Sequence, residues 1–291
     1  MPRRPTYVTF YGYQPGRGCT TAAMNTALLL AMAGQKVLLW DWNLKCPGIE
    51  EFPYFSGQTT AGFASIIRGE MVPNTPPLGF TQVDDLLKKA VINIFRGTFD
   101  SGYLGFLPVY SSYNPENDRR LANHDWMEPL NDTRKKGGFE FLLRIESALN
   151  SLDLTEYHDP LDFIIIDAPM GCYVETDFAT ALFADILVVL SHEPTVLEKG
   201  QLDRIKEKNR LILRDFPKRK PWPVEIITIV PHTVQQNCIK KEQIRIPFVP
   251  TLFGCRDLLA TKKQVDLFSE GIPVLEEYKK IVELLLKLRP R

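Results

Sequence analysis

The sequence has no excess of charge of either sign and no long apolar run. Its 291 residues include 35 acidic and 35 basic side chains, so the formal net charge is zero. A chain without net positive charge is not attracted to nucleic acid by its overall charge, so the composition gives no strong indication of nucleic-acid binding. No apolar run reaches the roughly 18 residues of a membrane span. The basic start, Met-Pro-Arg-Arg, leads directly into a strand-like run without an apolar signal core, so we expect a cytoplasmic protein.

Cysteine is also sparse. The five cysteines are odd in number and show no CxxC spacing, which argues against a disulfide framework and against a zinc knuckle. In contrast, 44% of the residues are apolar and 11% are aromatic, which is the composition of a globular chain with a substantial core. The sequence shows no internal repeat and no linker of low complexity. We therefore expect one domain that spans residues 1–291.

Strand and helix patterns alternate at the start of the chain. Tyr7–Tyr11 and Lys36–Asp41 are apolar runs typical of buried strands. Between them, Thr20–Ala33 has apolar residues at helical spacing and is followed by Gly34, a residue that commonly ends helices. Strand, glycine-containing turn, helix and strand make a βαβ unit, which implies a parallel sheet.

An irregular insertion, about residues 52–160, separates this unit from further regular patterns. Within it we expect only a short strand at Leu104–Val109 and a helix at Phe139–Leu149. The later patterns predict strands at Asp162–Asp167, Ile186–Leu190, Val224–Val230 and Ile244–Val249, and helices at Glu198–Arg214 and Leu275–Leu288. Near-continuous apolar strands indicate a sheet that helices cover on both faces. The sequence therefore predicts a three-layer α/β fold with a mostly parallel, twisted central sheet.

A glycine-containing loop joins the first strand to the first helix. It reads Gly12-Tyr13-Gln14-Pro15-Gly16-Arg17-Gly18-Cys19-Thr20-Thr21. Glycines let successive backbone N–H groups and the helix N-terminus face an anion, and the Thr20 hydroxyl is suited to ligate magnesium. In the common phosphate loop a lysine precedes that hydroxyl, but here the residue is Cys19. From the local pattern alone, an ordinary glycine turn is an equal alternative.

The sequence resembles the ParA/MinD-like ATPases in three segments that occur in the correct order, of which the glycine-containing loop is the first. The ParA/MinD-like ATPases are P-loop NTPases of the SIMIBI class with a deviant Walker A motif. The similarity is to their bacterial branch, whose loop reads KGGVGRTT. Asp41–Gly48 is similar to that branch's DLDLEAPG switch I segment, and Phe163–Gly171 to its strand ending in DxPxG, the Walker B and switch II element. Pro247–Pro250 resembles the loop beside the nucleotide base. The loop residues that match are Tyr13, Gly16, Gly18, Thr20 and Thr21.

The resemblance implies the P-loop NTPase fold and a site for ATP or ADP with Mg²⁺. Magnesium is then expected at Thr20, Asp41 and Asp167, directly or through water, and catalysis is expected to depend on Asp41 and on the position of Asn43. The resemblance also implies a homodimer, or a heterodimer with an active homologue, and an effector protein. Nucleotide contacts are expected from Gln14, Pro15, Gly16, Arg17, Gly18, Cys19, Thr20, Thr21, Asp167, Pro169, Gly171 and Pro250.

The chain departs from this family where the chemistry is expected. Gln14 replaces the signature lysine that reaches a phosphate across the dimer, Cys19 replaces the second cation of the loop, and Asn43 replaces the aspartate that directs the attacking water. One trans-acting cation is worth roughly 10³–10⁵ in the rate of phosphoryl transfer. An amide cannot act as a carboxylate base. We therefore expect slow hydrolysis or none, and two interpretations stay open: a switch that binds nucleotide weakly, and a pseudo-ATPase scaffold that binds none and acts by oligomerisation.

Three further features have a functional and a structural interpretation. Cys19, Cys46 and Cys172 fall in loops that we expect to converge, where they form a redox or metal site or fill tight turns as small residues. We expect the amphipathic C-terminal helix, Leu275–Leu288, to dock on its own domain, and membrane contact through this helix is the less favoured alternative. Trp40 and Trp42 are expected on opposite sides of the sheet, with at least one of them in the core and the other in the core or, as the less favoured alternative, at a subunit contact.

Overall fold

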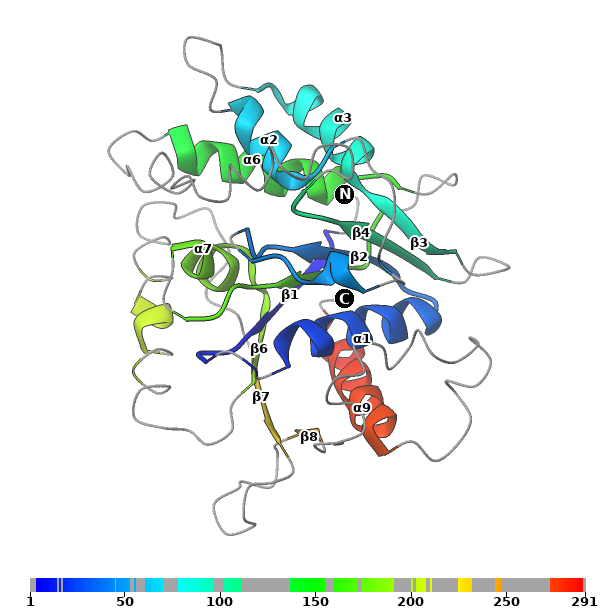
Figure 1. Ribbon diagram of the computed structural model, residues 1–291. Coiled ribbons are helices and arrows are strands. Elements are labelled where there is room, and N and C mark those ends of the chain that lie inside the picture. Colours follow the sequence, from blue (N-terminus) through cyan, green and yellow to red (C-terminus); the bar gives the residue numbers. More distant parts are fainter. Residues whose placement is uncertain are drawn as a thin grey trace.

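A central sheet between two layers of helices organises the chain in the computed structural model (Figure 1). The structure describes residues 4–14, 16, 18–44, 46–52, 55, 61–70, 78–96, 102–110, 137–154, 160–171, 174–190, 200, 203–207, 210, 225–231, 244–246 and 273–289. The strands are β1 (Thr6–Tyr11), β2 (Lys36–Asp41), β3 (Ile92–Arg96), β4 (Tyr103–Leu107), β5 (Phe163–Asp167), β6 (Ile186–Leu190), β7 (Glu225–Pro231) and β8 (Ile244–Ile246). The helices are α1 (Cys19–Met32), the 3₁₀ turn η1 (Ile49–Glu51), α2 (Phe63–Glu70), α3 (Phe80–Ala90), α6 (Gly137–Ser151), α7 (Val174–Asp177), the π-helix η3 (Phe178–Phe183) and α9 (Pro273–Leu288).

The described strands form one sheet in the order β3-β4-β2-β5-β1-β6-β7-β8. Every neighbouring pair is parallel except β3 and β4, which run antiparallel. The chain passes from β1 toward β2 and β4, and then from β5 toward β6, β7 and β8. The strand order therefore reverses at β1 and β5, and in open α/β sheets ligands bind beyond the carboxyl ends of the strands at such a point.

Each face of the sheet carries its own hydrophobic core. Helices α2, α3 and α6 and the π-helix η3 cover one face, and α1 and α9 cover the other (Figure 1). Strand β5 is buried along its whole length, with Ile164 and Ile166 in the first core and Phe163 and Ile165 in the second. This alternation confirms that the near-continuous apolar runs belong to strands covered on both sides. The predicted three-layer, mostly parallel α/β fold is confirmed.

The stretch of residues 52–160 is more regular than its sequence indicates. Its described residues include α2, α3 and the strand β3, none of which was expected, in addition to β4 and α6. The edge strand β3 carries a register shift between Asn93 and Phe95, and such irregularity hides a two-residue period from the sequence. Whether residues 1–291 make one domain stays a prediction, because part of this stretch lies outside the described residues.

The expectation that Trp40 and Trp42 lie on opposite sides of the sheet is wrong. Both side chains are fully buried in the same core, and their rings meet edge to face with centroids 4.8 Å apart. Side chains two residues apart along an extended chain point to the same face, so the pair shares one side. Phe63 and Phe183 contact both tryptophans, with ring centroids 4.9–5.5 Å apart. The two tryptophans are therefore core residues of the layer that contains α2 and η3.

The C-terminal helix α9 packs on α1, as expected. Its stripe of Tyr278, Ile281, Val282 and Leu285 is buried in the second core. Burial raises the pKa of Tyr278 to about 12, although a hydrogen bond with Asn25 of α1 opposes the shift. Docking thus accounts for the apolar face of this helix. Among the residues that the structure describes, no helix is long and apolar enough to cross a membrane.

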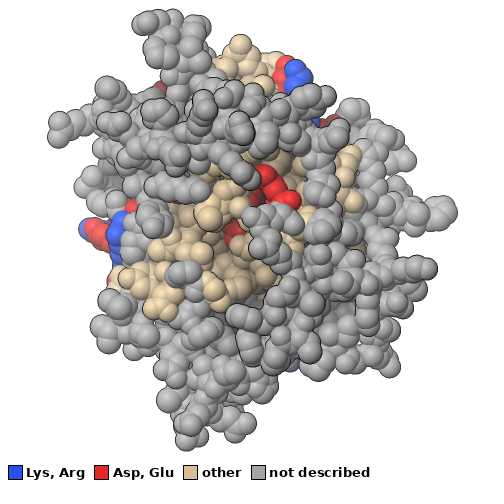
Figure 2. All heavy atoms as spheres, in the orientation of Figure 1, with Lys and Arg blue, Asp and Glu red and all other residues tan. Residues whose placement is uncertain are grey.

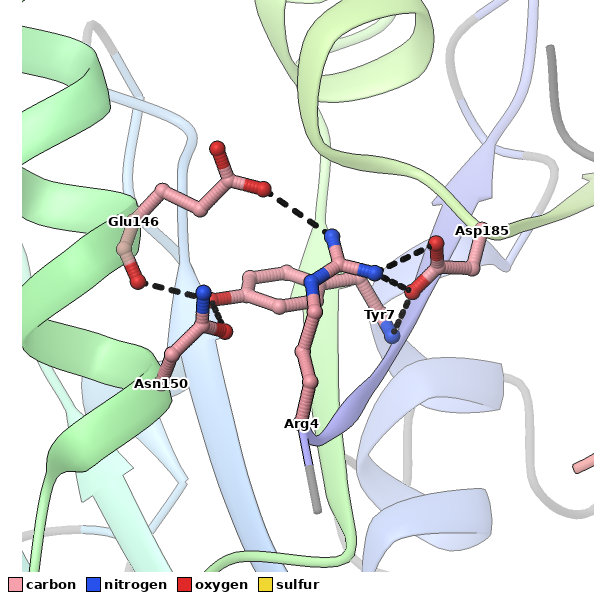
Figure 3. Close-up of polar contacts among 5 residues, drawn as sticks. All are labelled: Arg4, Tyr7, Glu146, Asn150 and Asp185. Atoms are coloured by element: carbon pink, nitrogen blue, oxygen red, sulfur yellow. Dashed lines mark hydrogen bonds and ion pairs between the residues drawn. The ribbon is translucent and has the colours of Figure 1, made fainter. Parts of the chain in front are cut away.

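At the amino-terminal edge of the sheet, Arg4 joins three elements (Figure 3). Its guanidinium donates to both carboxylate oxygens of Asp185, at 2.7 and 2.8 Å, and to Glu146 of α6 at 2.9 Å. It also lies 4.8 Å from the ring centroid of Tyr7, whose hydroxyl donates to Asn150 at 3.0 Å. These contacts fix the starts of β1 and β6 against α6, at the edge opposite the carboxyl ends of the strands.

Candidate functional site

The loop between β1 and α1 has open space beside its two described glycines. Gly16 and Gly18 have φ angles of +75° and +80°, a conformation that favours glycine, and a Cβ atom added at either would meet nothing within 4 Å. Helix α1 starts at Cys19, and its first internal hydrogen bond runs from the Ala22 N–H to the Gly18 carbonyl at 2.8 Å. The preceding N–H groups have no partner within the helix, and its first turn carries no acidic residue. Such a helix start suits an anion.

Two buried aspartates lie next to this loop. Asp41 ends β2 and Asp167 ends β5, and they are paired residues of these adjacent parallel strands. Asp41 is 0% exposed and Asp167 is 2% exposed. Burial raises the pKa of Asp41 well above its usual value, and the neighbouring charge of Asp167 raises it further. Burial also raises the pKa of Asp167 from 3.8 to about 7. Two carboxyl groups in this arrangement favour a shared proton or a bound cation.

The Asp41 carboxylate organises the loop that follows β2. Its Oδ1 accepts the N–H of Asn43 at 2.9 Å, and its Oδ2 accepts the N–H groups of Gly48 at 3.3 Å and Ile49 at 3.5 Å. These bonds hold Asn43, Gly48 and Ile49 against the carboxylate. Asp41 is therefore at least a structural anchor of the switch I-like segment, and its expected part in magnesium binding and catalysis stays a prediction.

Asp167 retains an oxygen without a partner. Its Oδ1 is buried and has no hydrogen-bond partner. The Asp167 side chain also makes a hydrogen bond with Thr20 of α1, which lowers the pKa of Asp167 but by less than burial raises it. A buried carboxylate oxygen without a donor is costly unless a ligand satisfies it. The Asp167–Thr20 pair at the open loop has the hard oxygen donors that Mg²⁺ prefers. These residues therefore fit a magnesium ion.

The described residues do not form a complete metal site by themselves. In the described part of the chain, no group of three or more His, Cys, Asp or Glu residues is arranged to hold a metal ion. Mg²⁺ is often bound by one or two protein oxygens together with phosphate oxygens and water. Figure 2 shows acidic atoms near the middle of the face that it draws, while the described lysines and arginines visible there lie toward its margins.

The loop after β5 is tied to the loop after β1. The Gly171 N–H donates to the Gly12 carbonyl at 3.4 Å, and the Tyr11 hydroxyl donates to the Gly171 carbonyl at 3.1 Å. Gly171 has a φ angle of +85°, which explains glycine at this position. The carbonyl of the buried Pro169 accepts the Thr176 hydroxyl at 3.0 Å. The structure thus brings the Walker A-like and switch II-like segments together.

Asn43 belongs to the turn after β2. Its side-chain amide donates to the Cys46 carbonyl at 2.6 Å, and the Cys46 N–H donates back to the Asn43 carbonyl at 3.2 Å. A carboxylate could not donate the first of these bonds. The asparagine at this position therefore stabilises a local turn, and this supports the expectation that it is not a general base.

The remaining predicted site residues lie in different surroundings. Gln14 is exposed, Thr20 and Thr21 are half-buried in the first turn of α1, and Cys19 is buried in the core beneath α1. Cys46 is exposed, so the two described cysteines of the expected trio lie in different environments. The expectations for Pro15, Arg17, Cys172 and Pro250 fall outside the described residues.

Two residues near the site were not predicted from the sequence. Glu50 of η1 raises the pKa of Asp41 through its charge and accepts the Tyr110 N–H at 3.2 Å. The Trp42 indole N–H donates to the Glu175 carbonyl of α7 at 2.7 Å. The second contact joins residues 133 positions apart. No local sequence pattern indicates a contact over such a separation.

Comparison with known proteins gives structural neighbours and no sequence relatives. No protein-family profile matches this sequence, and no curated protein matches it. A Cyanothece McdA variant in complex with ATP superposes with a TM-score of 0.59 at 18% identity, over 100% of this chain and 99% of that one. MinD of the Aquifex aeolicus MinC:MinD complex gives 0.55 at 17% identity, over 98% and 97%. MinD of Pyrococcus horikoshii with Mg-ADP gives 0.52 at 16% identity, over 99% of both chains.

These neighbours are ParA/MinD-family ATPases that align with nearly the full length of this chain. At identities below 20% the likeness extends to the fold alone. The mostly parallel sheet and its two layers of helices agree with this likeness in fold. The chain has the ParA/MinD-type P-loop NTPase fold.

Proposed function

We propose that this chain is a ParA/MinD-like nucleotide switch. It binds ATP or ADP weakly with Mg²⁺, hydrolyses ATP slowly or not at all, and signals to a partner through the loops that follow β2 and β5. One observation carries the proposal. The buried carboxylates of Asp41 and Asp167 lie side by side, with one oxygen unsatisfied, next to Thr20 at the uncapped start of α1.

The phosphates of the nucleotide are assigned to the loop that contains Gly16 and Gly18. Its left-handed glycines, the open space beside them and the start of α1, which has no side-chain cap, form an anion-binding turn. Two of the structural neighbours carry ATP and Mg-ADP. We expect reduced affinity because Gln14 and Cys19 supply no positive charge at the two positions where the resembled family has cations.

Magnesium is assigned to Thr20 and Asp167, with Asp41 in support. When bound, the ion neutralises phosphate charge and orients the phosphates. The unsatisfied Asp167 Oδ1 is the acceptor available to it or to its bound water. Asp41 already accepts backbone N–H groups through both oxygens, so its contribution is the position of the loop after β2.

Turnover is expected to be slow because the catalytic groups are replaced. Loss of one cation at the phosphates lowers the rate by roughly 10³–10⁵. The Asn43 amide is committed to the Cys46 carbonyl and cannot accept a proton from water. Signalling then depends on which nucleotide is bound and needs no fast hydrolysis.

The partner is proposed to contact the loops after β2 and β5. A ligand between Thr20 and Asp167 lies beside both loops, so its presence changes the surface that they form. A structural neighbour was solved as a complex with a second protein, MinC. We propose a homodimer, or a heterodimer with an active homologue that supplies the missing lysine, together with an effector.

A scaffold that binds no nucleotide is the second candidate. Two observations favour it: Cys19 is buried in the core, and the Asn43 amide donates a hydrogen bond within its own turn. Both residues therefore stabilise the fold at positions where the resembled family has catalytic side chains. Such a chain acts by oligomerising with an active ATPase or an effector.

Calorimetric titration of the full chain with ATP and MgCl₂, followed by a turnover assay, separates the two candidates. The switch predicts saturable, magnesium-dependent heat with little phosphate release. The absence of both heat and thermal stabilisation at millimolar nucleotide would support the scaffold. Rapid phosphate release would show that other residues replace the missing cations.

A further inference from the structure

Trp42 occupies the first position after β2 and contacts two other segments of the site. Its backbone N–H donates to the Asp167 carbonyl at 3.0 Å, and its indole Nε1–H donates to the Glu175 carbonyl at 2.7 Å. Trp42 lies between Asp41 and Asn43, and the Asn43 backbone N–H donates a hydrogen bond to the Asp41 carboxylate. Because its side chain is fully buried, the indole has no water to replace the Glu175 carbonyl.

The helix that receives this bond is irregular and depends on side chains for its hydrogen bonds. Residues 174–177 are α-helical, and residues 178–183 form a π-helix, a geometry that is rare and frequent at functional sites. Side-chain donors reach three of its carbonyls: Trp42 at Glu175, Thr180 at Thr176 and Thr9 at Ala179, over 2.7–2.8 Å. Two of these donors, Trp42 and Thr9, lie outside residues 174–183, so the position of this segment depends on β1 and on the end of β2.

The same segment is joined to the loop after β5. The Thr176 hydroxyl donates to the Pro169 carbonyl at 3.0 Å, two residues beyond Asp167. Residues 174–183 therefore contact the ends of both carboxylate strands, through Trp42 on the β2 side and through Thr176 on the β5 side. If the ends of β2 and β5 move relative to each other, residues 174–183 have to move as well, or one of these two hydrogen bonds has to break.

We propose that Trp42 is a positioning residue that couples the Asp41–Asp167 carboxylate pair to residues 174–183. The inference rests on the proposed function, from which it takes magnesium nucleotide as the ligand. A change in the loop after β2 on binding magnesium nucleotide is transmitted through the indole to this helix, and so to the surface beside it. The coupling is carried by one buried hydrogen bond and requires the indole N–H.

Trp40 provides a matched control within the same core. Trp40 is fully buried, and its ring contacts those of Trp42, Phe63 and Phe183. Its Nε1, unlike that of Trp42, has no hydrogen-bond partner. Trp40→Phe and Trp42→Phe remove similar volumes from one aromatic cluster, but only Trp42→Phe removes a hydrogen bond. The difference between the two variants isolates the proposed coupling from loss of packing.

Amide hydrogen exchange on the full-length chain, with and without ATP and MgCl₂, tests the proposal. Without ligand, Trp42→Phe is expected to raise exchange in residues 174–183 by about tenfold over Trp40→Phe, since local protection follows local hydrogen bonding. With ligand, the wild type and Trp40→Phe are expected to gain protection both in residues 16–22 and in residues 174–183. Trp42→Phe keeps the first gain and loses the second.

Each outcome decides a separate claim. Equal exchange of the two variants in residues 174–183 would overturn the role of Trp42. If ATP and MgCl₂ change no protection in the wild type, the nucleotide switch fails, while the ligand-free comparison still decides whether Trp42 positions the helix. If Trp42→Phe does not fold, benzothienylalanine at position 42 keeps the shape of the indole without its N–H, and the same difference in exchange is expected.

Discussion

Asp41 and Asp167 are paired across two adjacent parallel strands, and both carboxyl groups are buried. Among the described residues, no lysine or arginine forms an ion pair with either of them. Two buried carboxylates cannot both hold their charge at low cost without a cation. The ligand-free chain therefore carries an electrostatic cost at this site.

The first prediction concerns pH. The pKa of Asp167 is raised from 3.8 to about 7 in the folded chain, so the protonated carboxyl favours the folded state. This contribution is fully present below about pH 4 and is lost as the pH rises through 7. At about 1.4 kcal/mol for each pKa unit, the loss is on the order of 4 kcal/mol. Denaturant unfolding of the ligand-free chain between pH 4 and pH 8 should show it.

Asp167→Asn is the control for this pH dependence, because the amide does not titrate. The variant should unfold with a flatter pH profile and be more stable than the wild type at pH 8. Identical profiles for the two chains would contradict the assignment of the shifted pKa to Asp167.

The second prediction compares two threonines of α1. Thr20 interacts with Asp167, whereas the buried Thr26 Oγ1 has no hydrogen-bond partner. Thr20→Val should weaken magnesium-dependent ATP binding by about tenfold or more, in line with loss of a metal-site oxygen. Thr26→Val should bind as the wild type does, since only a methyl group replaces an unpaired hydroxyl. Equal affinities of the two variants would place the nucleotide elsewhere.

The third prediction concerns the two missing cations. Gln14 is exposed, so Gln14→Lys should fold normally and strengthen ATP binding by adding positive charge to the loop. Cys19 is 5% exposed within the second core, so Cys19→Lys should lower the free energy of unfolding by on the order of 2 kcal/mol. Thermal unfolding and calorimetry of both variants check this. A stable Cys19→Lys variant with tight ATP binding would show that the site tolerates the family residue.

The fourth prediction concerns Arg4 at the opposite edge of the sheet. Arg4→Met removes the bonds to Asp185 and Glu146 and leaves these half-buried carboxylates without their cation. The variant should lose roughly 1–3 kcal/mol of stability and keep the ATP affinity of the wild type, because the contact lies at the edge of the sheet opposite the loop that is proposed to bind the nucleotide. Arg210→Met, which removes an exposed pair with Glu207, should change neither. Loss of ATP binding in Arg4→Met would contradict this separation of roles.

The sequence was sufficient to predict the strands that carry the site. Strands β1, β2, β5 and β6 are buried on both faces, so their sequences are continuous apolar runs with clear ends. The loop glycines and the two terminal aspartates could be placed at one sheet edge for the same reason, since carboxyl ends of parallel strands meet there. By contrast, the edge strand β3 and the helices α2 and α3 lack this double burial and were missed.

Other properties of the site depend on tertiary contacts. The three backbone donors to Asp41 come from a folded loop, and the Trp42–Glu175 bond joins distant segments. The unsatisfied oxygen of Asp167 follows from the packing around it. Such details decide whether a carboxylate is an anchor or a metal-site candidate, and residue type alone does not distinguish these roles.

The most direct test of the nucleotide switch is a calorimetric titration of the wild type and Asp167→Asn with ATP in the presence and absence of MgCl₂. The account predicts saturable binding by the wild type that weakens strongly without magnesium, and little dependence on magnesium in Asp167→Asn. Absence of binding by the wild type at millimolar ATP, or equal magnesium dependence in both chains, would contradict it.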